Sequence, residues 1–145
     1  MGCQHAVDDK YAQLETLVHG YSEGERLSKF RAIFVLTEEG CLPCTKAFAR
    51  ILENHVDDTT CLFWVSAMGT GLDITPYRSS GKRVIWDYDN RLQDSGILVG
   101  SGAIILANGK IDTIVHIGNA RTAAESLNYI SDLLHYQRSD SLGGH

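Results

Sequence analysis

Proline, long apolar runs and excess positive charge are all scarce in this chain of 145 residues. It contains only 2 prolines, and no apolar stretch approaches the roughly 20 residues of a membrane-spanning helix. Lysine and arginine number 13 against 18 for aspartate and glutamate, which gives a formal net charge of −5. A protein that binds nucleic acid would present a basic stripe, so we expect no nucleic-acid partner.

Cysteine is also scarce, because four residues are too few for a disulfide-built scaffold of this length. Only Cys41 and Cys44 are closely spaced. A structural zinc site needs four ligands, commonly in two short-spaced pairs, and the 6 histidines show no pairing of that kind. The sequence therefore predicts no metal site, and no motif in it indicates a cofactor.

The amino terminus, Met1-Gly2-Cys3, allows two interpretations. A cysteine followed by a polar segment is how a bacterial lipoprotein begins once its signal has been removed, and residues 1–30 themselves lack the apolar core of a signal peptide. A lipid on Cys3 would tether the protein to a membrane outside the cytoplasm, in the periplasm or cell envelope. In the other interpretation Cys3 is an incidental thiol in a loose terminus, and a cytoplasmic location stays open.

The spacing of apolar residues predicts a single domain over residues 1–145, with a core at about 8–136 and a flexible tail at 137–145. Apolar runs that flank Asn108-Gly109 predict a hairpin, because this pair favours tight reversing turns. The expected elements, in order, are a helix at 8–21, a strand at 30–36, a helix from 45, a strand at 59–67, an irregular segment at 68–81, a strand at 82–89, a short helix at 90–97, hairpin strands at 103–106 and 111–117, and a helix at 120–136.

The motif Cys41-Leu42-Pro43-Cys44 stands between an expected strand and an expected helix. Its spacing allows a redox dithiol, half of a metal site, a structural disulfide or two inert buried thiols. At a helix start, unpaired N–H groups and the helix dipole favour the thiolate of Cys41, which is the reactive species in thiol exchange. Pro43 suits the first turn, because it has no N–H and its φ is close to the helical value.

This order of elements around the motif resembles the thioredoxin superfamily, in particular its bacterial extracytoplasmic and often lipid-anchored members. The resemblance spans roughly residues 30–136 and depends on the CLPC motif and the hairpin "IILANGKI". It implies an α/β fold, a three-layer α/β/α sandwich with a central mixed β-sheet. It also implies a monomeric thiol–disulfide oxidoreductase that acts on protein disulfides, with Cys41 attacking and Cys44 resolving, and a protein thiol or disulfide as its partner.

The chain departs from the pattern of this family at three places. Gly40 replaces the usual aromatic residue before the first cysteine, and Val35 stands where reductases of this type bury an acid. The family also has a cis-proline at the start of the hairpin strand, where Ser101 or Gly100 stands here. Together with Pro43 these two residues are the expected substrate contacts, and a trans backbone is expected because a non-proline cis bond costs about 3 kcal/mol.

Two functional hypotheses follow from these observations. The first is the disulfide oxidoreductase, and the alternative is a catalytically weak binding or redox-sensing lipoprotein of the same fold. Glu38 and Glu39 either oppose a nearby thiolate or are solvated loop residues. Cys61 is expected to be an inert core residue, since a buried free cysteine behaves as a small apolar side chain.

Overall fold

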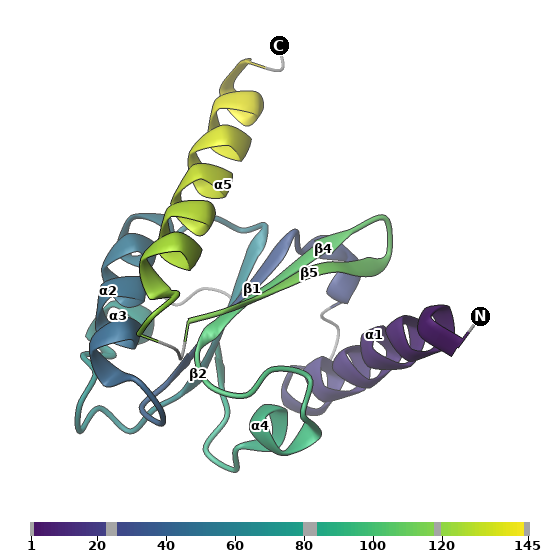
Figure 1. Cartoon of the computed structure of the whole chain (residues 1–145), viewed down its shortest axis with the longest axis horizontal. Helices are drawn as coiled ribbons and strands as arrows, with labels where there is room; N and C mark the ends of the chain where they lie inside the picture. The colour runs from purple at the N-terminus through teal and green to yellow at the C-terminus, as the bar shows by residue number, and fades with distance from the viewer. Residues whose placement is uncertain (1, 23–25, 80–83, 118–119, 144–145) are drawn as a thin grey trace.

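A mixed β-sheet forms the middle layer of the fold (Figure 1). The computed structural model describes residues 2–22, 26–79, 84–117 and 120–143, with side chains at 9–22, 26–78, 84–117 and 120–135. The strands are β1 (Ala32–Thr37), β2 (Cys61–Ser66), β3 (Val84–Trp86), β4 (Gly102–Ala107) and β5 (Lys110–His116). The helices are α1 (Gly2–Tyr21), α2 (Leu42–Leu52), α3 (Thr75–Ser79), α4 (Arg91–Ser95) and α5 (Ala123–Gly143), with short 3-10 turns at Leu27–Lys29 and Glu53–His55.

Strand β1 lies at the centre of the sheet, whose order is β3-β2-β1-β4-β5. It pairs in parallel with β2 and antiparallel with β4, and all six of its residues are buried. A strand covered on both faces needs apolar side chains on both, which is why its sequence is a nearly continuous apolar run. The disulfide motif follows directly from the carboxyl end of this central strand.

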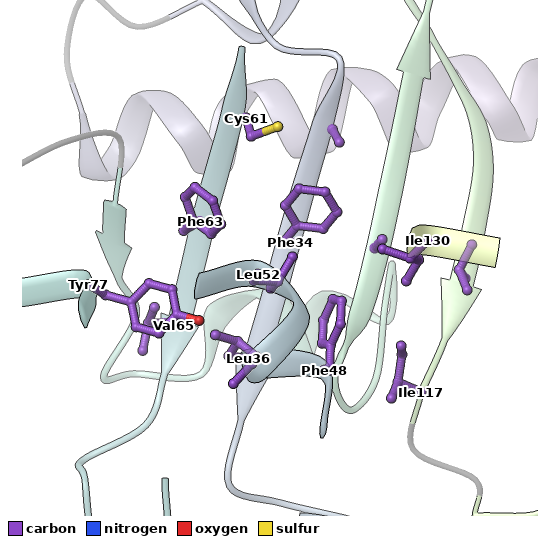
Figure 2. Close-up of a cluster of buried hydrophobic side chains, with 14 of the residues drawn as sticks. Phe34, Leu36, Phe48, Leu52, Cys61, Phe63, Val65, Tyr77, Ile117 and Ile130 are labelled. Carbon is purple, nitrogen blue, oxygen red and sulfur yellow. The ribbon is translucent and has the colours of Figure 1, made fainter. Parts of the chain in front are cut away.

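Alternate side chains of the strands enter two different cores. Phe34 and Leu36 pack with Phe48 of α2 and Ile130 of α5 in the core shown in Figure 2. The intervening β1 residues, Ile33 and Val35, pack on the opposite face with side chains of α1 and α4. Helices therefore cover both faces, and the predicted three-layer α/β/α sandwich with a central mixed sheet is confirmed. This arrangement is consistent with a thioredoxin-like sandwich.

The predicted hairpin is formed by β4 and β5, which pair antiparallel. Its turn residues, Asn108 and Gly109, both have positive φ values, 55° and 72°. Two consecutive residues in this conformation are what a tight hairpin turn requires, and asparagine and glycine adopt it at the lowest steric cost.

Three elements differ in extent from the sequence prediction. Helix α1 begins at Gly2 instead of Asp8, and α5 continues to Gly143 through residues for which a flexible tail was predicted. Residues 137–142 contain neither proline nor glycine, so no strong helix breaker stands before Gly143. Strand β3 ends at Trp86, and residues 82–83 of its predicted range lie outside the described part of the chain.

The length and apolarity of the helices bear on the membrane question. Across the described residues, no helix combines the length and the apolar content needed to cross a bilayer. The side chain of Cys3 lies outside the described side chains, so its role as a lipid attachment point stays a prediction.

Candidate redox site

The two cysteines of the motif form a disulfide at the start of α2. Cys41 is the residue before the helix and has an extended backbone, with φ −79° and ψ 95°, while Cys44 lies in the first turn. Their Cα atoms are 5.3 Å apart, within the usual range for a disulfide. The turn from strand to helix thus brings together the two side chains that the sequence marked as catalytic.

The helix start directs N–H groups toward Cys41. The backbone N–H of Cys44 donates to the Cys41 Sγ at 3.3 Å, and the N–H of Thr45 donates to the Cys41 carbonyl oxygen at 3.1 Å. Pro43 is exposed in the first turn, where its missing N–H leaves no helical hydrogen bond unmade. On reduction, the Cys44 N–H and the helix dipole would stabilise a thiolate at Cys41.

The two sulfurs differ in their access to solvent. Cys41 is partly exposed, whereas Cys44 is only 7% exposed and packs in the core beneath the helix. An incoming thiol or disulfide therefore reaches Cys41 more easily. This asymmetry suits attack at Cys41 and release by Cys44.

Ser101 joins three segments next to the motif. Its Oγ accepts from the Thr37 N–H at 3.1 Å and donates to the Thr37 carbonyl oxygen at 3.2 Å. The same Oγ is 2.7 Å from the Thr45 hydroxyl. Ser101 is 1% exposed, so its hydroxyl serves these internal contacts. The peptide bond before it is trans, as predicted for a non-proline residue.

Gly100, the other residue expected in this slot, is held by the side chain of Gln93. The Gly100 N–H donates to the Gln93 Oε1 at 2.7 Å, and its carbonyl oxygen accepts from the Gln93 Nε2 at 3.4 Å. The φ of Gly100 is 86°, a conformation that favours glycine. Its backbone groups are thus satisfied within the chain, and substrate contact by Gly100 and Ser101 stays a prediction.

Glu38 holds the loop after β2 against the motif. Its carboxylate accepts from the backbone N–H groups of Met68 at 2.8 Å and Leu72 at 2.9 Å, and from that of Gly71. The Thr70 hydroxyl adds a further hydrogen bond at 3.2 Å. Partial burial alone would raise the pKa of Glu38, but these donors outweigh it and lower the pKa to about 2. Glu38 is thus a loop residue whose carboxylate is bound within the chain, and its effect on a thiolate at Cys41 stays a prediction.

Asp87 is a buried carboxylate that also lies just after the carboxyl end of a strand, and it was not among the residues predicted from the sequence. It is fully buried and accepts from Trp64 Nε1 at 2.9 Å, from the Tyr21 hydroxyl, and from the N–H groups of Arg91 and Leu92 at 3.0 Å. Burial raises the pKa of Asp87, and the hydrogen bonds more than offset this, so the pKa is lowered overall. An acid just before the short helix α4 was the available signal, since such residues cap helix starts.

Cys61 and Val35 confirm two expectations about the interior. Cys61 is fully buried in the core of Figure 2, and burial raises the pKa of its thiol to about 12. A thiol of this kind is unreactive at neutral pH. Val35 is fully buried in β1 on the face opposite α2, so it supplies no proton-transfer group.

Within the ranges that the structure describes, no three histidine, cysteine, aspartate or glutamate side chains lie close enough together to hold a metal ion.

Comparisons with known proteins found no matching family model, no matching curated protein and no matching solved structure.

Proposed function

We propose that this chain is a thioredoxin-superfamily thiol–disulfide oxidoreductase that acts on protein disulfides through Cys41 and Cys44. The observation that carries the proposal is the disulfide at the start of α2, with a partly exposed Cys41 and a buried Cys44. The spacing, the helix start and the difference in access are together suited to thiol exchange.

The proposed reaction has two exchange steps. In the reduced protein, the Cys41 thiolate attacks one sulfur of the substrate disulfide, so that a mixed disulfide forms and a substrate thiolate leaves. The Cys44 thiolate then attacks the Cys41 sulfur, which re-forms the Cys41–Cys44 bond and releases the second substrate thiolate. Two electrons pass to the substrate, and the two protons from the cysteines end on the substrate thiols. A dithiol donor reverses the change in the protein.

A binding function is the second candidate, and a specific observation favours it. Gln93 binds both backbone polar groups of Gly100, and the Ser101 side chain is buried, so the groups expected to contact a substrate already have partners within the chain. A protein of this fold with an unreactive disulfide would use its surface to hold a partner or to signal its redox state.

A redox titration separates the two candidates. Cys3 and Cys61 are changed to serine, the protein is equilibrated in graded glutathione buffers, and free thiols are counted by alkylation and mass. A reversible transition within the glutathione range, roughly −180 to −320 mV, supports the oxidoreductase. A disulfide that resists every buffer, or that never forms, contradicts it and leaves the binding protein.

The roles of the two cysteines are tested with single variants in the same background. Cys44→Ser is expected to accumulate a mixed disulfide with a protein substrate, because the resolving thiol is gone. Cys41→Ser is expected to accumulate far less, because the remaining thiol at Cys44 is buried. Equal trapping by both variants would contradict the assignment.

A further inference from the structure

A cavity of about 180 Å³ opens at the carboxyl ends of the three parallel strands β1, β2 and β3. Its walls come from the segments that follow β1, β2 and β3, and carboxyl ends of parallel strands are a common place for ligands. Glu39, in one wall, is two residues from Cys41, so their Cα atoms are within roughly 7 Å. We call this the acidic cavity; Glu38, Glu39, Ser66, Met68, Asp87 and Tyr88 are among the residues that line it.

Three carboxylates contribute to the walls of the acidic cavity, and none of the lysines or arginines that the structure describes does. Glu38 and Asp87 keep their charge because neutral N–H and O–H donors hold their oxygens, as described above. Glu39 is exposed, and its carboxylate has no hydrogen-bond or ion-pair partner among the described residues. A hollow lined by charges of one sign concentrates its field and attracts the opposite charge.

The remaining lining suits a cation carried on an aliphatic stem. Met68 is 69% exposed and Tyr88 is 54% exposed, which leaves a thioether and an aromatic ring accessible at the rim. The Tyr88 ring stacks on Trp86 with centroids 6.2 Å apart, and an aromatic face attracts cations. In the part of the chain that the structure covers, the Ser66 Oγ is buried without a hydrogen-bond partner, so this residue of the same wall carries an unsatisfied hydroxyl.

The size of the acidic cavity narrows the class of ligand. Sites for small molecules usually enclose about 300–1,000 Å³, which is more than this cavity offers. A single long side chain needs less room, and those of lysine and arginine place apolar carbon along a wall and the charge at its end.

We propose that the acidic cavity binds a lysine or arginine side chain of the polypeptide whose disulfide is exchanged at Cys41. This inference rests on the proposed oxidoreductase function and names the class of substrate: disulfides flanked by basic residues. Because Glu39 is only two residues from Cys41, a basic residue bound at Glu39 would belong to the same stretch of substrate as the disulfide.

The first test compares three peptides that share one internal disulfide and differ only in the residue after the first cysteine, which is arginine, glutamine or glutamate. The reduced protein, with Cys3 and Cys61 changed to serine, reduces each peptide, and each rate constant is divided by that for dithiothreitol to remove intrinsic reactivity. At low salt the arginine peptide is expected to react about five-fold faster than the glutamine peptide, and the glutamate peptide slowest, in line with a partly exposed ion pair.

Two variants and a high-salt condition test whether this preference comes from the cavity. Glu39→Gln is expected to bring the ratio of arginine to glutamine rates close to one. Glu53→Gln makes the same change in net charge at the far end of α2 and is expected to leave the ratio unchanged. About 1 M salt is expected to weaken the preference by screening it. Equal normalised rates for the three peptides would overturn the inference while leaving the oxidoreductase standing.

A binding measurement keeps the inference testable if no exchange occurs. The oxidised protein is titrated with the tripeptides acetyl-Gly-Arg-Gly-amide and acetyl-Gly-Gln-Gly-amide, and amide NMR shifts are followed at Met68 and Tyr88. If the arginine peptide causes shifts, the glutamine peptide causes none, and the reduction assay shows no disulfide exchange, the result would support binding in the acidic cavity and overturn the proposed function. Neither shifts nor exchange would overturn both.

Discussion

Replacing Glu38 with glutamine tests whether its carboxylate holds the loop after β2. Glutamine has nearly the same shape, but it has one acceptor oxygen, and its amide N–H₂ would face donors that now point at the carboxylate. The change therefore removes the charge and about half of the accepting capacity. The loop backbone at Met68, Gly71 and Leu72 would lose hydrogen bonds to a charged group.

The magnitude follows from the pKa of Glu38, which falls from 4.5 to about 2 on folding. At about 1.4 kcal/mol per pKa unit this difference corresponds to roughly 3 kcal/mol of stability. Because Glu38 is only partly buried, water screens the interaction, and we expect a loss of about 1–2 kcal/mol at pH 7.

The pH dependence has a definite sign. A carboxyl whose pKa is lowered by folding stabilises the protein above its unfolded pKa and loses that contribution as the pH falls through its folded pKa. The difference in unfolding free energy between the wild type and Glu38→Gln should therefore be full at pH 7 and shrink between about pH 4.5 and pH 2. All other acids are present in both proteins, so their titration cancels when the two unfolding free energies are subtracted.

Urea unfolding at pH 7 and pH 3, followed by fluorescence of the two tryptophans, measures this difference. Glu39→Gln serves as the control, since that side chain has no partner among the described residues and its loss should change stability by less than about 0.5 kcal/mol. The reasoning is refuted if Glu38→Gln unfolds like the wild type at pH 7, or if the difference is the same at both pH values.

Three other predictions follow from buried groups. Asp87→Asn should lower the free energy of unfolding in urea by about 3 kcal/mol, because an amide N–H₂ would face two of the donors whose hydrogen bonds the carboxylate now accepts. A loss under about 1 kcal/mol would contradict this network. Ser101→Ala should cost about 2 kcal/mol by leaving the buried Thr37 N–H without its acceptor, whereas a neutral result would show that water replaces the hydroxyl. Cys61 should resist iodoacetamide at pH 8 in the folded protein and react in urea, as checked by mass spectrometry, because burial raises its thiol pKa to about 12; rapid alkylation of the folded protein would contradict its burial.

Features that depend on neighbours along the chain were predictable. The apolar run of β1, the spacing in α2 and the Asn108-Gly109 turn each encode their structure locally, because the period of apolar residues and the φ values of single residues decide it. The CLPC motif is equally local, since a strand followed by a helix start places both cysteines within disulfide distance.

The surroundings of the disulfide depended instead on segments far apart in the sequence. Glu38 accepts hydrogen bonds from residues 30 and 34 positions later, and Ser101 bonds Thr45 across 56 positions. Asp87 accepts from the nearby start of α4, which its local sequence could indicate, but also from Tyr21 of α1 and Trp64 of β2, which it could not. By itself the sequence determined the layers, the hairpin and the cysteine pair. Only the tertiary structure decided which polar groups satisfy one another around that pair, because a hydrogen bond depends on distances and angles that arise once distant segments have packed.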